Sequence, residues 1–306
     1  MSLSQNAGKP FFGAITKKST KANLSVLGIP WDASSSYRRG ATKAPDAIRR
    51  ATSNKLFSPY TELNVNLIDK WQIFDWGDVG ISTDNPIDAH NAVSARLKDI
   101  YGTWKKNRFL FLGGDHLATY FCFTSLFSDD GPFKGQKASI IYLDAHPDLY
   151  PHYEGNKYSH ACVVRRIIEQ TEINPKNIVL VGIRATTPSQ LDYIDDTGIT
   201  IFSRRTFQTK GPQQVANEVK AVLQERVNYI YLSIDLDILD PAFAPGLGNP
   251  EPGGLSTAEL VIFIQRLISL PIFAFDIVEL CPSHDHSNIS AFAAAKLIKE
   301  TLGIMR

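Results

Sequence analysis

The chain has 306 residues, of which 43% are hydrophobic, 21% charged and 10% aromatic, with 32 basic against 31 acidic side chains. This length supports a sizeable core, and the composition excludes collagen-like, coiled-coil and disordered chains. A formal net charge of +1 leaves no basic excess, so we expect neither a nucleic acid nor a membrane surface as a partner.

Short apolar runs alternate with helical patterns along the chain, after a polar leader. In chain order we predict strand Leu24–Ile29, helix Ala44–Ala51, helix Asp88–Trp104, strand Phe109–Leu112, strand Ala138–Leu143, helix His160–Gln170, strand Asn177–Val181, helix Gln213–Val227, strand Asn228–Ile234, helix Thr257–Leu270, strand Ile272–Val278 and helix Ser290–Leu302. Ser256 before Thr257, with Glu259 just after it, is typical of a helix start.

The strands are apolar almost throughout, which indicates burial on both faces, as in a parallel sheet. Their alternation with helices predicts an α/β fold, a three-layer α/β/α arrangement around a mostly parallel, doubly wound sheet. The interior holds no linker-like stretch and no internal repeat. We therefore expect one domain over residues 1–306, with residues 1–20 as a loosely attached leader.

The cysteine pattern and the N-terminus suggest a cellular location. Cys122, Cys162 and Cys281 are an odd, widely spaced set that is not typical of a disulfide framework. The N-terminal segment has no apolar stretch of the kind found in signal peptides, and no apolar run approaches the ~20 residues of a membrane span. We therefore expect a cytoplasmic protein.

Three predicted strands end in turns that are rich in acidic residues and histidine. The first turn is Gly113-Gly114-Asp115-His116, the second is Asp144-Ala145-His146-Pro147-Asp148, and the third contains Asp235 and Asp237. In an open α/β sheet, ligands bind outside the carboxyl ends of the strands. We therefore expect these turns to converge on one crevice.

The acidic residues in these turns predict a cation. Four carboxylates in one pocket cannot all be ionised side by side without a strong positive charge among them. A shell of carboxylates assisted by two imidazoles suits Mn²⁺ better than the thiolate-rich sites that zinc prefers. Each motif alone is also common as a cap or turn. Together they predict a site for two ions with six candidate ligands: His116, Asp144, His146, Asp148, Asp235 and Asp237.

These motifs resemble those of the ureohydrolase superfamily, the arginase–agmatinase group of manganese enzymes that cleave guanidino groups and release urea. The matching positions run from Gly28 to Asn288, and they include the Gly-x-Pro-x-Asp segment that begins at Gly28, the three turns, and Glu279. Residues 154–161 and 243–255 are more similar to agmatinases, particularly the archaeal type, than to arginases.

The resemblance implies two Mn²⁺ per chain and a homotrimer or homohexamer. One ion would be held by His116, Asp144, Asp148 and Asp235, and the other by His146, Asp144, Asp235 and Asp237. Hydroxide would attack the guanidinium carbon, in keeping with the lowered pKa of a water between two cations.

The resemblance also assigns the catalytic and substrate-binding residues. Glu279 would bind the planar guanidinium, for which a carboxylate is the natural partner; otherwise it is a surface acid at a strand end. His160 would carry protons to the leaving amine, unless it makes only a local hydrogen bond at a helix start. His152 lies in the same loop and competes for that role.

The substrate tail is the open question. Arginases carry an asparagine at the position of Tyr150, which argues against arginine, and Tyr150 and Glu154 suit an alkyl-ammonium tail. We expect hydrolysis of agmatine to putrescine and urea. Aminopropylagmatine, guanidinobutyrate, guanidine, arginine and formimidoylglutamate remain open. The other classes are a mononuclear zinc amidohydrolase, which would not need His116, and a catalytically silent metal-binding scaffold.

Overall fold

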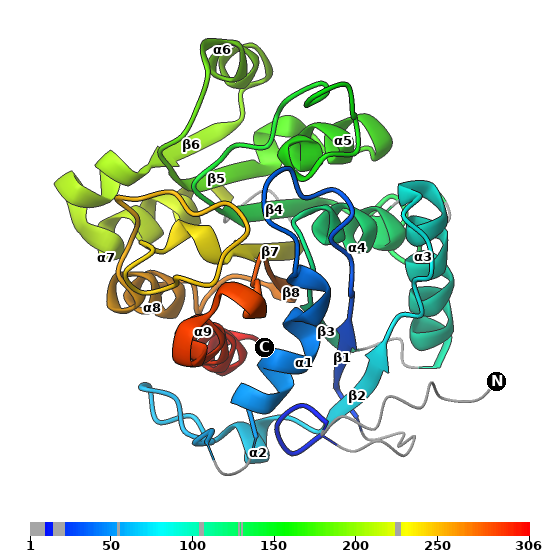
Figure 1. Cartoon of the computed structure of the whole chain (residues 1–306). Coiled ribbons are helices and arrows are strands. Elements are labelled where there is room, and N and C mark those ends of the chain that lie inside the picture. The colour runs from blue at the N-terminus through cyan, green and yellow to red at the C-terminus, as the bar shows by residue number, and fades with distance from the viewer. Residues whose placement is uncertain are drawn as a thin grey trace.

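The computed structural model describes residues 10–14, 22–53, 56–103, 107–127, 129, 131–223 and 228–306. Its strands are β1 (Leu24–Gly28), β2 (Ile73–Asp78), β3 (Arg108–Leu112), β4 (Ala138–Leu143), β5 (Ile178–Ile183), β6 (Thr200–Ser203), β7 (Tyr229–Asp235) and β8 (Ile272–Val278). They form one sheet in the order β2-β1-β3-β8-β7-β4-β5-β6 (Figure 1). Every pairing between these strands is parallel, as the apolar runs predict.

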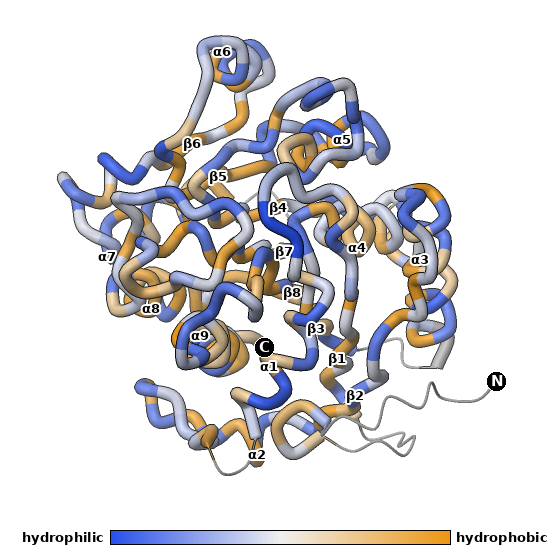
Figure 2. Tube along the Cα trace, in the orientation of Figure 1, coloured by the Kyte–Doolittle hydropathy of each residue, from blue (hydrophilic) through white to orange (hydrophobic). Residues whose placement is uncertain are grey.

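Helices cover both faces of the sheet. The helices are α1 (Ala44–Ala51), α2 (Leu67–Lys70), α3 (Pro86–Thr103), α4 (Leu117–Phe127), α5 (Val163–Gln170), α6 (Pro188–Thr197), α7 (Arg204–Leu223), α8 (Thr257–Arg266) and α9 (Ile289–Ile304). One apolar cluster joins the sheet to α1, α7, α8 and α9, and a second joins the other face to α3, α4 and α5. In Figure 2 the central strands are mostly coloured as hydrophobic. The predicted three-layer α/β/α fold is confirmed.

All six predicted strands are present, and two more complete the sheet at its edges. These are β2, whose sequence is interrupted by Asp75 and Asp78, and the four-residue β6. Helix α4 is buried on every side and therefore shows no amphipathic period. Helix α7 begins nine residues before the predicted Gln213, with a kink at Gly211. The predicted ends at Trp104 and at residues 224–227 lie outside the described residues.

Residues 10–14 of the expected loose leader are packed against the rest of the protein. Phe11 is fully buried, and its backbone N–H donates to Asp75 Oδ2 at 2.7 Å. Loose attachment is therefore wrong for this segment, and residues 1–9 and 15–20 lie outside the described residues. Within the described ranges, no helix combines the length and the apolar character needed to span a bilayer.

A buried arginine links α1 to the edge strand β2. Arg49 Nε and Nη2 donate to the two oxygens of Asp75 at 2.8 and 2.9 Å, and Nη1 donates to Asp78 at 2.6 Å. Both Arg49 and Asp75 are buried. Because a buried carboxylate needs a partner, this ion pair fixes how the N-terminal part of the chain packs.

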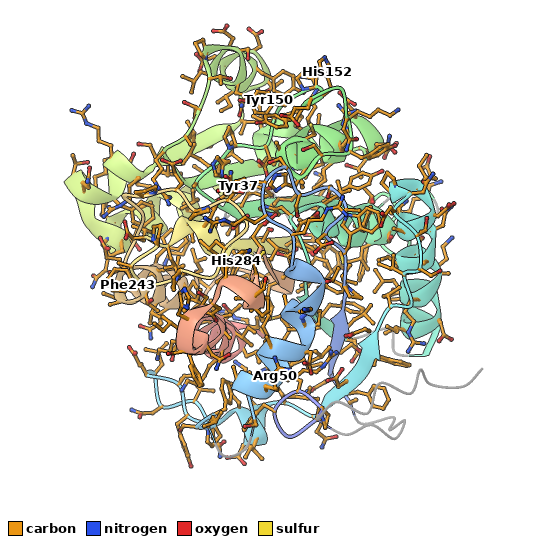
Figure 3. All side chains as sticks on the ribbon, in the orientation of Figure 1. Tyr37, Arg50, Tyr150, His152, Phe243 and His284 are labelled. Carbon is orange, nitrogen blue, oxygen red and sulfur yellow. The ribbon has the colours of Figure 1, made fainter. Side chains whose placement is uncertain are left out.

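Replacing Arg49 with methionine is expected to lower the free energy of unfolding by about 3–5 kcal/mol, because Asp75 is left buried and unpaired. Urea unfolding followed by circular dichroism measures the change. Arg50→Met is the matched control, since Arg50 (Figure 3) is exposed and pairs with the exposed Asp46 on the same helix. Its effect should stay within about 1 kcal/mol. Equal losses in both variants would contradict a structural role for the Arg49 pair.

Candidate active site

The acidic turns meet at the carboxyl ends of four neighbouring strands. His116 follows β3, Asp144 follows β4, Asp235 ends β7 and Glu279 follows β8. These strands lie side by side in the order β3-β8-β7-β4. The chain therefore brings four distant segments to one edge of the sheet, as the sequence predicts.

The backbone at this edge is constrained. A Cβ atom on Gly114 would lie only 1.7 Å from the carbonyl oxygen of Trp31, so only glycine fits there. Asp148 and Glu279 have positive φ angles of 48° and 65°, in the left-handed region. The N–H of Glu279 donates to the carbonyl of Gly114 at 2.8 Å, which helps to hold that conformation. Strained backbone of this kind clusters at functional sites.

One group of candidate ligands surrounds the ring of His116. Its Nδ1 atom lies 2.9 Å from Asp235 Oδ2, 3.0 Å from Asp144 Oδ2 and 3.4 Å from Asp148 Oδ2. All four side chains are buried. The structure therefore brings together the four residues expected to hold the first ion.

A second group shares Asp144 with the first. His146 Nδ1 lies 2.8 Å from Asp237 Oδ2 and 3.4 Å from Asp144 Oδ1. His146 is partly exposed, whereas both carboxylates are buried. A ligand atom from each of His116, Asp144 and Asp235, and likewise from each of Asp144, His146 and Asp237, lies close enough to the others to hold an ion. These two groups form a candidate metal-binding cluster.

The charges in this cluster fit divalent cations. Burial and the neighbouring Asp144 raise the pKa of Asp148 to about 7, and burial with Asp237 raises the pKa of Asp235 well above its ordinary value. Asp144 Oδ2 is buried and has no hydrogen-bond partner among the described residues. Carboxylate oxygens and imidazole nitrogens are the ligand set that Mn²⁺ accepts. The residues present therefore fit a pair of such ions.

Ser233 and Asp276 orient the ring of His116. Ser233 Oγ donates to Asp276 at 2.9 Å and lies 2.9 Å from His116 Nε2. Since the single hydroxyl proton goes to Asp276, Ser233 accepts from Nε2–H, and Nδ1 is the ring nitrogen that faces the carboxylates. The sequence reasoning missed Asp276, although an acid inside the apolar run Ile272–Val278 is itself a signal of a buried polar role.

Tyr142 supports the same cluster from β4. Its hydroxyl donates to Asp148 Oδ2 at 2.7 Å, and its ring stacks on His116 with centroids 4.4 Å apart. Nothing in the sequence marks this tyrosine, because it stands in an apolar strand like any core aromatic residue.

Glu279 and His160 form a buried pair beside the cluster. Glu279 Oε1 accepts from the backbone N–H of His116 at 2.8 Å and lies 3.0 Å from His160 Nδ1. Its other oxygen, Oε2, is buried, and no residue in the described part of the chain hydrogen-bonds to it. Burial lowers the pKa of His160, but the adjacent Glu279 outweighs it and raises that pKa to about 9. Glu279 therefore favours the protonated form of the ring.

A cavity of about 280 Å³ opens above these groups. Both histidines of the cluster, its four carboxylates, His160 and Glu279 all line it. Its other walls come from loops and from α6, and include Ser36, Tyr150, Tyr153, Ala161, Ala185, Thr186, Thr187, Gln190 and Asn249. Gln190 is 3% exposed, and within the described ranges its Oε1 has no hydrogen-bond partner.

Two residues singled out in the sequence are not brought to this cavity. Glu154 is exposed and absent from the lining, with its φ of 50° placing it in a turn. His152 is also exposed and outside the lining, whereas His160 lies within it. Figure 3 labels His152 and Tyr150, which belong to the same loop. Because residues 151–157 carry few apolar side chains, the sequence gives no signal of which ones turn inward.

Comparison with known proteins adds to this geometry. A profile described as "Arginase family" matches residues 22–303. The chain belongs to the arginase family. It is 35% identical over 289 residues to "Arginase 1, mitochondrial" of Arabidopsis thaliana, covering 92% of this chain and 80% of that protein. It is 30% identical over 292 residues to an agmatinase of Chromobacterium violaceum, covering 93% and 84%.

Solved structures of the family share the fold. The structure of proclavaminate amidino hydrolase from Streptomyces clavuligerus aligns with a TM-score of 0.85, 28% identity and 96% coverage of both chains. The predicted likeness to the ureohydrolases is confirmed, and this chain is an arginase-family hydrolase. Since these three relatives carry three different names, membership of the family does not select a substrate.

Proposed function

We propose that this protein hydrolyses agmatine to putrescine and urea, with two Mn²⁺ bound per chain. The observation that carries this proposal is the free Oε2 of Glu279, which is buried, unpartnered and next to the cavity above the candidate metal cluster. A guanidinium group offers the planar N–H donors that such an oxygen lacks.

The six cluster residues would hold the two ions in the two groups described above, with Asp144 common to both groups and Asp235 assigned to both ions by the family resemblance. When bound, the ions supply Lewis acidity and lower the pKa of water, so that hydroxide is available near neutral pH. The family likeness and the geometry of the cluster both support this assignment.

Glu279 and His160 would handle the substrate together. Because Glu279 Oε1 is occupied by the His116 N–H and the His160 ring, Oε2 is the oxygen left to bind the guanidinium. His160 is a proton donor at neutral pH, since its pKa is raised to about 9 by Glu279 against the opposing effect of burial. A departing amine requires such a donor.

The aromatic and amide side chains that line the cavity favour a substrate with a simple ammonium tail. Tyr150 and Tyr153 pack edge to face there, with ring centroids 5.4 Å apart, and aromatic faces attract cations. The unpartnered Oε1 of Gln190 can accept from an ammonium group. None of the described lining residues is arginine or lysine, the side chains that usually pair with a substrate carboxylate.

We predict that kcat/KM for agmatine exceeds that for arginine by at least ~10²-fold, because the arginine carboxylate would be desolvated without an arginine or lysine partner. Steady-state urea release on both compounds, with Mn²⁺ supplied, measures the ratio. A panel with aminopropylagmatine, guanidinobutyrate, guanidine and formimidoylglutamate completes the test. Arginine equal to agmatine would overturn the substrate, and absence of turnover on every compound would overturn the reaction.

The family likeness also supports a homotrimer or homohexamer in the cytoplasm as part of this proposal. Sedimentation velocity on the Mn²⁺-loaded protein measures the assembly directly. A monomer at micromolar concentration would contradict it.

A further inference from the structure

Both ring nitrogens of His160 are already engaged. Nδ1 lies 3.0 Å from Glu279 Oε1, and Nε2 faces Ser36, with the serine Oγ at 2.8 Å and its backbone N at 3.2 Å. Ser36 comes from the loop that follows β1, far from His160 in the sequence. In this arrangement no ring nitrogen of His160 is left to contact a substrate directly.

Hydrogen bonds to Asp115 hold the loop that carries Ser36. This buried carboxylate accepts from the Ser34 N–H at 3.0 Å, from Ser34 Oγ at 2.6 Å and from Ser35 Oγ at 3.3 Å. The backbone N–H of His160 donates in turn to the carbonyl of Ser34 at 3.3 Å. The contact between Ser36 and the His160 ring is therefore set by buried hydrogen bonds on both sides.

Ser36 contacts the buried His160 ring and also lines the cavity. His160 is only 8% exposed, whereas Ser36 is exposed and lines the same cavity as Glu279. A hydroxyl can accept one proton and donate another. Its position at the edge of the cavity gives the ring a hydrogen-bonded path to any group bound there.

We propose that the Ser36 hydroxyl relays a proton from His160 to the leaving amine, an inference that rests on the proposed hydrolysis. The Nε2–H bond of the imidazolium breaks as that proton moves to Ser36 Oγ, while the Oγ–H bond breaks and its proton forms a new bond to the amine nitrogen. Ser36 is unchanged, His160 becomes neutral, and the amine gains one proton.

The groups at Nε2 suit both states of the ring. In the imidazolium, Nε2–H donates to Ser36 Oγ, and in the neutral ring Nε2 accepts from the backbone N–H of Ser36. The charged groups that face His160 are Glu279 after β8, Asp115 after β3 and Asp148 after β4. Of these, Glu279 contacts the ring directly, at 3.0 Å from Nδ1.

The test compares Ser36→Ala with Ser36→Thr. The alanine variant is expected to lose about 10- to 100-fold in kcat, part of the usual contribution of proton transfer, with KM and Mn²⁺ content close to those of the parent. The threonine variant keeps a hydroxyl and should recover most of the rate. Added imidazole buffer should accelerate the alanine variant more than the parent, because a small donor can replace the missing relay.

Tyr37→Phe is the matched control, because it also removes one hydroxyl from this loop. Tyr37 is 67% exposed and does not line the cavity, so its kcat should not change (Figure 3). Parental kcat in Ser36→Ala would overturn the relay. A loss confined to KM, or a loss accompanied by lower Mn²⁺ content, would also overturn it, since each would show that the hydroxyl binds substrate or supports the fold.

A measurement without substrate separates this inference from the proposed function. In protein labelled with ¹⁵N-histidine, the ring correlation that disappears in His160→Asn identifies His160, and its Nε2 shift is expected to change in Ser36→Ala but not in Tyr37→Phe. An unchanged shift would overturn the contact. If the parent releases urea from no guanidino compound, the proposed function fails before any variant is compared. If the parent is active and Ser36→Ala equals it, only the relay fails.

Discussion

Replacing Asp235 with asparagine is expected to abolish nearly all hydrolysis, with kcat/KM reduced by at least ~10³-fold. Asp235 Oδ2 lies 2.9 Å from His116 Nδ1, at the end of β7, and under the proposed function this carboxylate is shared by both ions. An amide lacks the negative charge that two cations require of a shared ligand. The substitution is therefore expected to weaken the binding of both ions.

Elemental analysis after Mn²⁺ loading and dialysis checks the cause. We expect about two ions per chain in the parent, fewer than one in Asp235→Asn, and about one in Asp237→Asn, which touches only the group around His146. Asp192→Asn is the control, because Asp192 is exposed on α6 and lies outside the cavity. One tightly bound zinc per chain in a fully active parent would contradict the dinuclear assignment.

The part of the site that could be predicted from the sequence is the part carried by strand ends. Asp144 and Asp235 each stand directly at the end of a mostly apolar run, and parallel strands bring their carboxyl ends to one edge. The sheet type, the convergence of the turns and the position of Glu279 follow from that single rule. The same rule misses β2 and β6, because edge strands need less apolar sequence than central ones.

The walls of the cavity could not be predicted, because they depend on loops and on contacts between distant segments. Gln190 enters from α6 and Ser36 from the loop after β1, and neither stands in a pattern that marks it. Glu154 was expected near the substrate from its charge alone, yet its loop turns it outward. Composition identifies which side chains suit a ligand, whereas the path of the loop decides which of them reach it.

A substitution at His160 separates loss of proton transfer from loss of metal binding. It lines the cavity, pairs with Glu279 at 3.0 Å and belongs to neither group of candidate metal ligands. The raised pKa of about 9, produced by Glu279 against the effect of burial, means that the ring is protonated below that pH and loses its proton as the pH rises through it. A reaction that uses this proton should therefore slow above about pH 9.

Replacing His160 with asparagine is expected to lower kcat by roughly 10²–10⁴-fold, the usual range for loss of a general acid, while Mn²⁺ content stays at the parental level. The decline in rate above about pH 9 should disappear in this variant, because the group that titrates there is gone. His152→Asn is the matched control in the same loop, and since His152 is exposed outside the cavity, it should keep the parental rate and pH profile. Urea release measured from pH 6 to 10 on all three proteins decides the matter. Parental turnover in His160→Asn, or a large loss in His152→Asn, would reassign proton transfer to another group.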